Sequence, residues 1–258
     1  MDPIFTGLIS GVVLLPLLVS LNYFIKAVTN IPSIFMIQLL LANILVILWV
    51  LAGIPVLVSP ELFLLNDIIL IEHLGVIAGS LTVNFIFLTF STSYFGNKMV
   101  ILPRLGVGIF SIIIGLKLSL ILINNPFETI YGLRISENTL QRHTHPLISL
   151  LALTGFLLLI IVLLVYSIWQ SKFPNYFITQ ETKNNSFLSA LLIGLGIIIN
   201  FVGIILPSSY LTISNFALLI SRFIVAMGFI FMSLQFYKNP IITLTEKNNP
   251  KTLLNITK

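Results

Sequence analysis

Four ionisable residues lie inside otherwise apolar stretches of the sequence, namely Glu72, His73, Lys117 and Arg222. An ionisable side chain at membrane depth is costly, so each is a candidate functional residue. From the rise of an α-helix, Glu72 and Lys117 fall about 8 and 10 Å below the outer ends of their predicted helices, so they can form an ion pair. Arg222 falls about 18 Å below the outer end of its own helix, and its long side chain can extend towards Asn200 or Glu72. A ligand-binding role and a purely structural pairing both fit these positions.

Two predicted helices carry polar residues at a spacing that places them on one helical face. These residues are His73, Ser80, Asn84 and Ser91 in one helix, and Asn215, Arg222, Ala226 and Ser233, with one alanine in the row, in the other. Gln38 and Asn43 add polar groups to a third helix, whereas residues 146–169 carry few and are predicted to face lipid. We expect helices two, three, six and seven to surround a polar interior that opens outward. The alternative is that these polar groups hydrogen-bond one helix to another.

The candidate site is therefore a ligand-binding or purely structural polar network inside the membrane. Its members are Glu72, His73, Asn84, Lys117, Asn200, Asn215 and Arg222.

Several kinds of membrane enzyme and cofactor protein lack their key residues here. The last apolar segment contains Arg222 and no lysine before Lys238, so a retinal Schiff base cannot form. A rhomboid-type protease needs a histidine on a partner helix and a di-haem cytochrome needs histidine pairs, yet His73 alone lies within an apolar stretch. The chain has no cysteine, and His143 and His145 lack a third metal ligand nearby. The sequence predicts no catalytic residues, no metal and no cofactor.

Composition defines the elements that must position these residues. Hydrophobic residues make up 57% of the 258 and charged residues 8%, with a mean hydropathy of +1.10. These values exclude a soluble globular protein, a disordered chain and a nucleic-acid-binding protein. A membrane-spanning helix needs about 20 apolar residues. Seven stretches are long enough, at residues 4–26, 33–58, 67–95, 99–124, 146–169, 187–207 and 210–237.

The fold class predicted is thus an all-α integral membrane protein, with a seven-helix domain at residues 1–237 and a short tail at 238–258. The division at Pro207 is the least marked, because residues 187–237 are apolar almost throughout.

The distribution of lysine and arginine predicts the orientation. If the N-terminus lies outside, nine basic residues fall on the cytoplasmic side and only Arg134 and Arg142 fall outside. The nine are Lys26, Lys98, Arg104, Lys172, Lys183, Lys238, Lys247, Lys251 and Lys258. Because cytoplasmic loops carry the excess of basic residues, we expect a multi-pass protein of the cell membrane with the N-terminus outside and the C-terminus in the cytoplasm.

The longest outer loop runs from residue 124 to residue 145. It contains the aromatic residues Phe127 and Tyr131 and charges of both signs. It is either a segment that contacts a ligand or an ordered connection between helices.

The end of the last predicted helix reads Phe236-Tyr237-Lys238-Asn239-Pro240. Together with the topology, this segment resembles the exit of the seven-helix membrane sensor region at the N-terminus of archaeal and bacterial histidine kinases and related sensors. The resemblance implies a sensor or receptor-like signalling module in the lipid bilayer, whose signal leaves through residues 237–240. The residues that follow contain no kinase or other output domain, so either a cytoplasmic signalling partner supplies the output or the chain is truncated.

Two other classes of protein remain open. One is a small-solute transporter or channel, although the chain has neither a Pro-Gln signature nor a clear three-helix repeat. The other is a scaffold subunit of a larger membrane complex.

Overall fold

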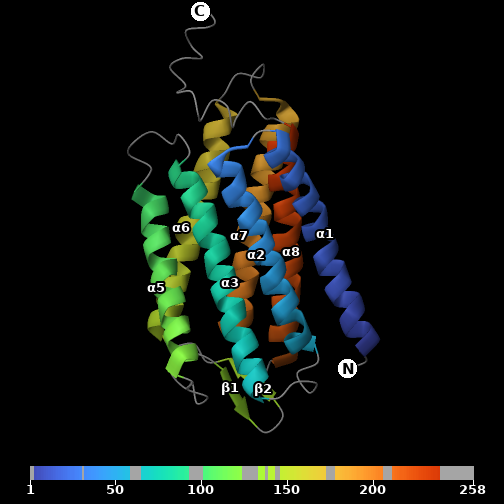
Figure 1. Cartoon of the computed structure of the whole chain (residues 1–258), viewed down its shortest axis with the longest axis vertical. Coiled ribbons are helices and arrows are strands. Elements are labelled where there is room, and N and C mark those ends of the chain that lie inside the picture. Colours follow the sequence, from blue (N-terminus) through green and yellow to red (C-terminus); the bar gives the residue numbers. More distant parts are fainter. Residues whose placement is uncertain are drawn as a thin grey trace, which may run out of the picture.

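The computed structural model describes residues 3–30, 32–58, 65–92, 101–123, 133–136, 139–142, 146–172, 178–205 and 211–238. Within these ranges the chain forms long helices that run alternately up and down (Figure 1). The helices are α1 (Pro3–Asn30), α2 (Ile34–Val58), α3 (Leu65–Thr92), α5 (Ile101–Ile123), α6 (Pro146–Ser171), α7 (Gln180–Ile205) and α8 (Leu211–Lys238).

Seven of the described helices are long and apolar enough to cross a membrane. This result agrees with the seven apolar stretches predicted from the sequence and indicates a multi-pass membrane protein. The largest difference in a helix boundary is at α7, which begins at Gln180 rather than at residue 187. Thr179 explains the earlier start, because its hydroxyl oxygen accepts a hydrogen bond of 3.2 Å from the backbone N–H of Thr182 and so caps the polar first turn.

The helices form a closed ring in which each helix packs against the next along the chain, and α8 packs against α1. The α7–α8 interface is the most extensive of these. The interfaces of α6 with α5 and with α7 are the least extensive in the ring. Across the ring, α2 contacts α8 and α3 contacts α6. Helix α8 is therefore the most firmly held helix of the bundle, and α6 is the least.

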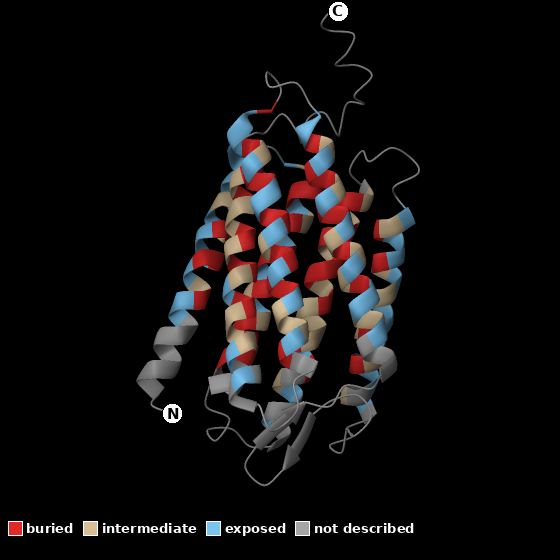
Figure 2. Ribbon diagram, turned by 180° about the vertical axis from the view of Figure 1, so that it is seen from behind, coloured by how far each residue is buried: buried red, intermediate tan, exposed pale blue. Residues whose placement is uncertain are grey.

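Buried apolar side chains fill the middle of the ring. The largest of those fully buried include Phe24, Phe87, Phe110 and Phe229. Large apolar residues also cover the outward faces of the helices, as Figure 2 shows by the exposed positions along them. Such a surface would be unfavourable in water over this whole area, and it suits contact with lipid.

A short antiparallel hairpin lies between α5 and α6, formed by β1 (Leu133–Ser136) and β2 (Thr139–Arg142). The hairpin was not predicted, although Leu133 and Ile135 alternate with polar residues as in a strand. The other residues of this loop, including Phe127, Tyr131, His143 and His145, lie outside the described residues. The hairpin and the start of α1 lie at one end of the bundle, called the hairpin end below, and α8 ends at the other, called the exit end (Figure 1).

Candidate functional site

Among the described residues, three pairs of neutral polar side chains join neighbouring helices of the ring by hydrogen bonds. The pairs are Asn43 with Ser20 between α2 and α1, Asn84 with Ser111 between α3 and α5, and Ser221 with Asn200 between α8 and α7. The amide of Asn84 donates to the Ser111 hydroxyl over 3.3 Å, and the Ser221 hydroxyl donates to Asn200 over 3.4 Å. Two of the predicted site residues, Asn84 and Asn200, thus hold helices together, as the alternative interpretation of the polar rows proposed.

Arg222 is buried within the bundle, with 4% of its surface exposed. Its guanidinium carbon lies 5.1 Å from the centre of the Trp49 ring on α2, a distance at which the cation is attracted by the aromatic face. A Cβ atom built on Gly53 would fall 2.6 Å from the same guanidinium carbon. Gly53 therefore leaves the space that the arginine occupies, and α2 and α8 meet through this contact.

Trp49 is in turn packed against α3. Cβ atoms built on Gly75 and Gly79 would both fall 3.7 Å from its ring, an ordinary van der Waals distance, so the indole lies against this stretch of α3. Gly75 and Gly79 are four positions apart and form the small-residue pattern by which membrane helices approach one another. The unit formed by Gly53, Trp49, Gly75, Gly79 and Arg222, called the arginine unit below, joins α2, α3 and α8.

The other predicted ionisable residues lie in the part of the bundle nearer the hairpin end. His73 on α3 and Lys117 on α5 are both buried, with 3% and 5% exposed. The side chains of Glu72 and Asn215 lie outside the described residues, so the proposed ion pair between Glu72 and Lys117 stays a prediction.

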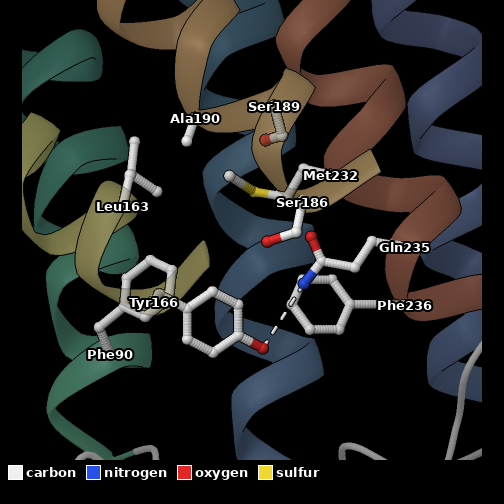
Figure 3. Close-up of a pocket in the computed structure, with 9 residues that line it drawn as sticks. All are labelled: Phe90, Leu163, Tyr166, Ser186, Ser189, Ala190, Met232, Gln235 and Phe236. Carbon is white, nitrogen blue, oxygen red and sulfur yellow. Dashed lines mark hydrogen bonds between the residues drawn. The ribbon is translucent and has the colours of Figure 1, made fainter. Parts of the chain in front are cut away.

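A cavity opens near the exit end, between α3, α6, α7 and α8 (Figure 3). Its lining residues are Phe90, Leu163, Tyr166, Ser186, Ser189, Ala190, Met232, Gln235 and Phe236. The space free of atoms is about 220 Å³ including the opening. The amide of Gln235 donates to the hydroxyl of Tyr166 across 3.5 Å, which is at the long limit of a hydrogen bond.

The cavity lies at the exit end, and the polar interior predicted to open at the outer end stays a prediction. We expected residues 146–169 to face lipid, and the last turns of α6 nevertheless bury Tyr166, Ser167 and Gln170. Tyr166 and Gln170 are four positions apart and share one helical face, which is a signal that the sequence did contain.

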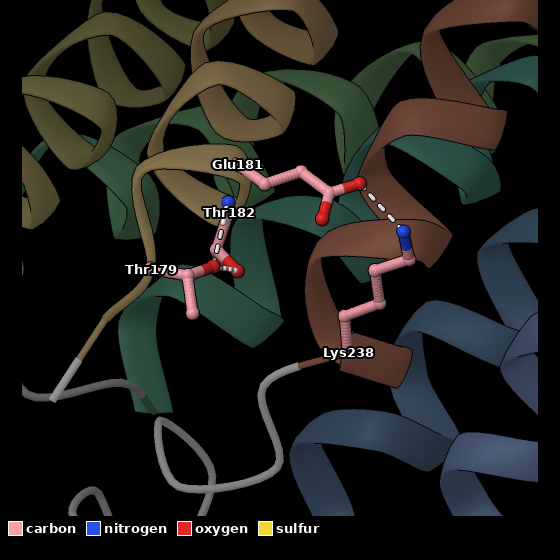
Figure 4. Close-up of polar contacts among 4 residues, drawn as sticks. All are labelled: Thr179, Glu181, Thr182 and Lys238. Atoms are coloured by element: carbon pink, nitrogen blue, oxygen red, sulfur yellow. Dashed lines mark hydrogen bonds and ion pairs between the residues drawn. The ribbon is translucent and has the colours of Figure 1, made fainter. Parts of the chain in front are cut away.

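The final turn of α8 contacts three other helices. Phe236 packs against Phe35 of α2 with ring centres 5.1 Å apart. Tyr237 packs against Tyr23 of α1 with ring centres 5.2 Å apart. The ammonium group of Lys238 lies 2.5 Å from a carboxylate oxygen of Glu181 on α7 (Figure 4).

Of the four residues predicted as a signal exit, the structure thus describes Tyr237 and Lys238. Asn239 and Pro240 lie outside the described residues.

The first turn of α7 is a junction for its neighbours. Thr179 and Thr182 hydrogen-bond through their hydroxyls over 2.9 Å, as drawn in Figure 4. Lys183 donates to the backbone oxygen of Ser171, the last residue of α6, over 3.2 Å. Glu181 is therefore held between two helix ends, and α6, α7 and α8 are connected at the exit end.

Among the described residues, no group of three or more His, Asp or Glu side chains has the arrangement of a metal site. Comparisons of the chain with models of protein families, with curated proteins and with solved structures find no match.

Proposed function

We propose that the chain is a sensor or receptor-like module of the cell membrane, with its N-terminus outside and its C-terminus in the cytoplasm. Its signal leaves through the end of α8 to a separate cytoplasmic partner. The sequence resemblance to the seven-helix region of histidine kinase sensors supports this proposal, and so do three features of the bundle.

The first feature is the distribution of charge between the two ends. The described basic residues near the exit end are Lys26, Arg104, Lys172, Lys183 and Lys238. Those near the hairpin end are Arg134 and Arg142, in the hairpin itself, and the buried Lys117 of α5. This excess of basic residues supports placing the exit end in the cytoplasm.

The second feature, which carries the proposal, is the position of α8. The middle of this helix holds Arg222 against Trp49, and its last turn contacts α1, α2 and α7. A rigid helix that moves at the arginine unit must also move at its exit, because its hydrogen-bonded backbone transmits the displacement. A partner bound at the exit end would detect that movement as a change among the α8, α1 and α7 contacts.

The third feature favours sensing over transport. Between Arg222 and the cavity, the inward face of α8 consists of the buried apolar residues Val225, Ala226 and Phe229. A polar solute crossing the bundle would have to leave its hydrogen-bonding partners at this layer, at a cost of several kcal/mol for each lost bond. A transporter or a channel is thus the second candidate, and a scaffold subunit is the third.

Orientation is tested by single cysteines, since the natural chain has none. In intact cells, a membrane-impermeant maleimide should label cysteine at Asp67 or Arg134 and should leave cysteine at Lys26 or Lys172 unlabelled. Labelling of the second pair alone would reverse the orientation.

Signalling is tested by the distance between spin labels on cysteines at Lys26 and Asn239, measured in bilayers of short-chain and long-chain lipids. A sensor should populate two distances whose ratio changes with the bilayer, while labels at Lys26 and Asn184 report an unchanged distance between α1 and α7. Arg222→Leu, in protein that still unfolds cooperatively, should abolish the change.

Transport is tested in parallel, by solute flux into liposomes that contain the protein. A sensor should move neither glycerol, a sugar nor K⁺. A single unchanging distance between the labels together with protein-dependent flux would contradict the proposal and support the transporter.

A further inference from the structure

The cavity at the exit end contains a buried hydroxyl that is not hydrogen-bonded to any described residue. The hydroxyl oxygen of Ser189 has no hydrogen-bond partner among the described residues, although only 2% of this residue is exposed. The Gln235–Tyr166 bond is stretched to 3.5 Å. A buried polar group without a partner costs about 1–3 kcal/mol, so a molecule that supplies the missing bonds is favoured here.

The lining also defines the charge of such a molecule. The polar groups are the hydroxyls of Ser186, Ser189 and Tyr166 and the amide of Gln235, and the other lining residues are apolar. An ion would be buried among these residues without an opposite charge, which is strongly unfavourable. The occupant is therefore uncharged, and it must both donate and accept hydrogen bonds, because hydroxyls and an amide do both.

The dimensions of the cavity restrict the occupant further. The enclosed part of the cavity has room for about one hydroxyl-sized group. The cavity is also partly open to its surroundings. Leu163, Met232 and Phe236 provide apolar surface for a short hydrocarbon chain. A small alcohol matches these three properties, with its hydroxyl in the enclosed part.

We propose that this cavity is a binding site for the hydroxyl end of a small uncharged alcohol. Helix α6 forms one wall, and its packing against α5 and α7 is the least extensive in the ring, so it can move outward to admit the hydrocarbon chain. Gln235 and Phe236 immediately precede the exit contacts of Tyr237 and Lys238. An occupant would therefore bear directly on the final turn of α8, and in this respect the inference rests on the proposed signalling function.

The binding experiment uses the full chain in lipid nanodiscs and a short 1-alkanol that carries a photoreactive diazirine. Illumination releases dinitrogen, and the resulting carbene inserts into a nearby X–H bond, so that peptide mass spectrometry locates the label. We expect labelling of the peptide that contains Tyr166, and competition by unlabelled 1-butanol. The matched diazirine alkane, which lacks the hydroxyl, should label this peptide only weakly.

Ser189→Ala should lower labelling at Tyr166 about fivefold, the effect of losing one hydrogen bond of roughly 1 kcal/mol. Ser119→Ala is the matched control, because Ser119 is exposed and bonds only its own helix backbone. Ser186→Ala is a second test should Ser189→Ala unfold. Equal labelling by the alkane, or labelling unchanged in both cavity variants, would show partitioning into lipid and overturn the site. If 1-butanol does not compete with the label, the cavity holds water alone, and this result would also overturn the binding site.

The response is measured separately, so the two proposals can fail independently. With spin labels at Lys26 and Asn239, 1-butanol should shift the distance distribution in the natural sequence and not in Ser189→Ala. Hydroxyl-dependent labelling without any distance change would retain the binding site and contradict its role in signalling. Loss of hydroxyl-dependent labelling would remove the site whatever the labels report.

Discussion

Two of the regions in which the described helices bury polar groups differ in charge and in packing. In the arginine unit, the guanidinium of Arg222 fills the space beside Trp49, and Gly53 lacks the side chain that would compete for it. In the cavity at the exit end, neutral groups such as Ser189 and Gln235 border space that no described atom fills. The first region is charged and closely packed, and the second is neutral and open.

The difference shows how the bundle separates a structural use of polarity from an adaptable one. A buried cation needs close, fixed contacts, because each lost interaction is costly where water is absent. Neutral hydroxyls can exchange one partner for another at a smaller cost. The arginine unit should therefore be sensitive to side-chain volume, and the cavity should be sensitive to hydrogen-bonding capacity.

The largest effect is expected for Gly53→Val. A side chain here would occupy the position of the guanidinium, and overpacking together with a displaced buried cation should lower the free energy of unfolding by about 3 kcal/mol. Thermal denaturation in detergent measures it. Gly108→Val is the matched control, since a Cβ at Gly108 meets no atom within 4 Å.

A double-mutant cycle sharpens this test. In an Arg222→Leu background the added valine meets a side chain without a guanidinium. Gly53→Val should therefore lower the free energy of unfolding much less than it does in the natural sequence. Strict additivity of the two changes would contradict the fit between glycine and arginine described above.

Trp49→Leu should have the next largest effect, a loss of about 2 kcal/mol. The change removes the aromatic face over which Arg222 lies, worth about 0.5–2 kcal/mol, as well as the packing on Gly75 and Gly79. Trp49→Phe keeps a smaller aromatic face and should retain part of that stability. If Trp49→Phe lowers the free energy of unfolding as much as Trp49→Leu does, the ring contributes by its volume alone. Thermal denaturation again provides the measurement.

The helices themselves could be predicted from the sequence, because crossing a bilayer requires long apolar runs that hydropathy detects directly. The burial of Lys117 and Arg222 was implied by the same argument and is observed. The contact of Arg222 with Trp49 was not predicted. It depends on which helices face each other across the ring, and in apolar segments nearly every face has the same composition.

The cavity was missed for a different reason. Gln170 and Ser186 lie just outside the predicted spans, where polar residues ordinarily mark the limit of the membrane, and Tyr166 lies inside a span that was predicted to face lipid. In the structure these end turns are long enough to bury them, and Gln170 is fully buried. The start of α7 at Gln180 was missed by the same reasoning, since its polar first turns were treated as a loop.

A smaller effect, opposite in sign, is expected for two buried serines, one in the cavity and one between α7 and α8. Ser189→Val removes a buried hydroxyl without a described partner, so stability should rise by about 1 kcal/mol. Ser221→Val removes the donor to Asn200 and should lower stability by about 0.6 kcal/mol, the average for such bonds in membranes. Denaturation of the two variants side by side measures the difference. A loss of stability in both variants would mean that the Ser189 hydroxyl already has a hydrogen-bond partner.

The smallest effect on stability is expected for Lys238→Gln, although this change should alter the exit most. Lys238 and Glu181 are 43% and 60% exposed, so water and salt screen their attraction and thermal unfolding should not change measurably. The ion pair nevertheless connects the last residue of α8 to the first turn of α7, where Lys183 also holds the end of α6.

Without this ion pair, the distribution of distances between spin labels at Lys26 and Asn239 should broaden. The same broadening should occur in the natural sequence at high salt. The exchange Lys238→Glu with Glu181→Lys should restore the narrow distribution, because it recreates the pair with its charges reversed. If the double exchange stays as broad as Lys238→Gln, the aromatic contacts of Phe236 and Tyr237 alone position the exit, and the charged junction plays no part in holding it.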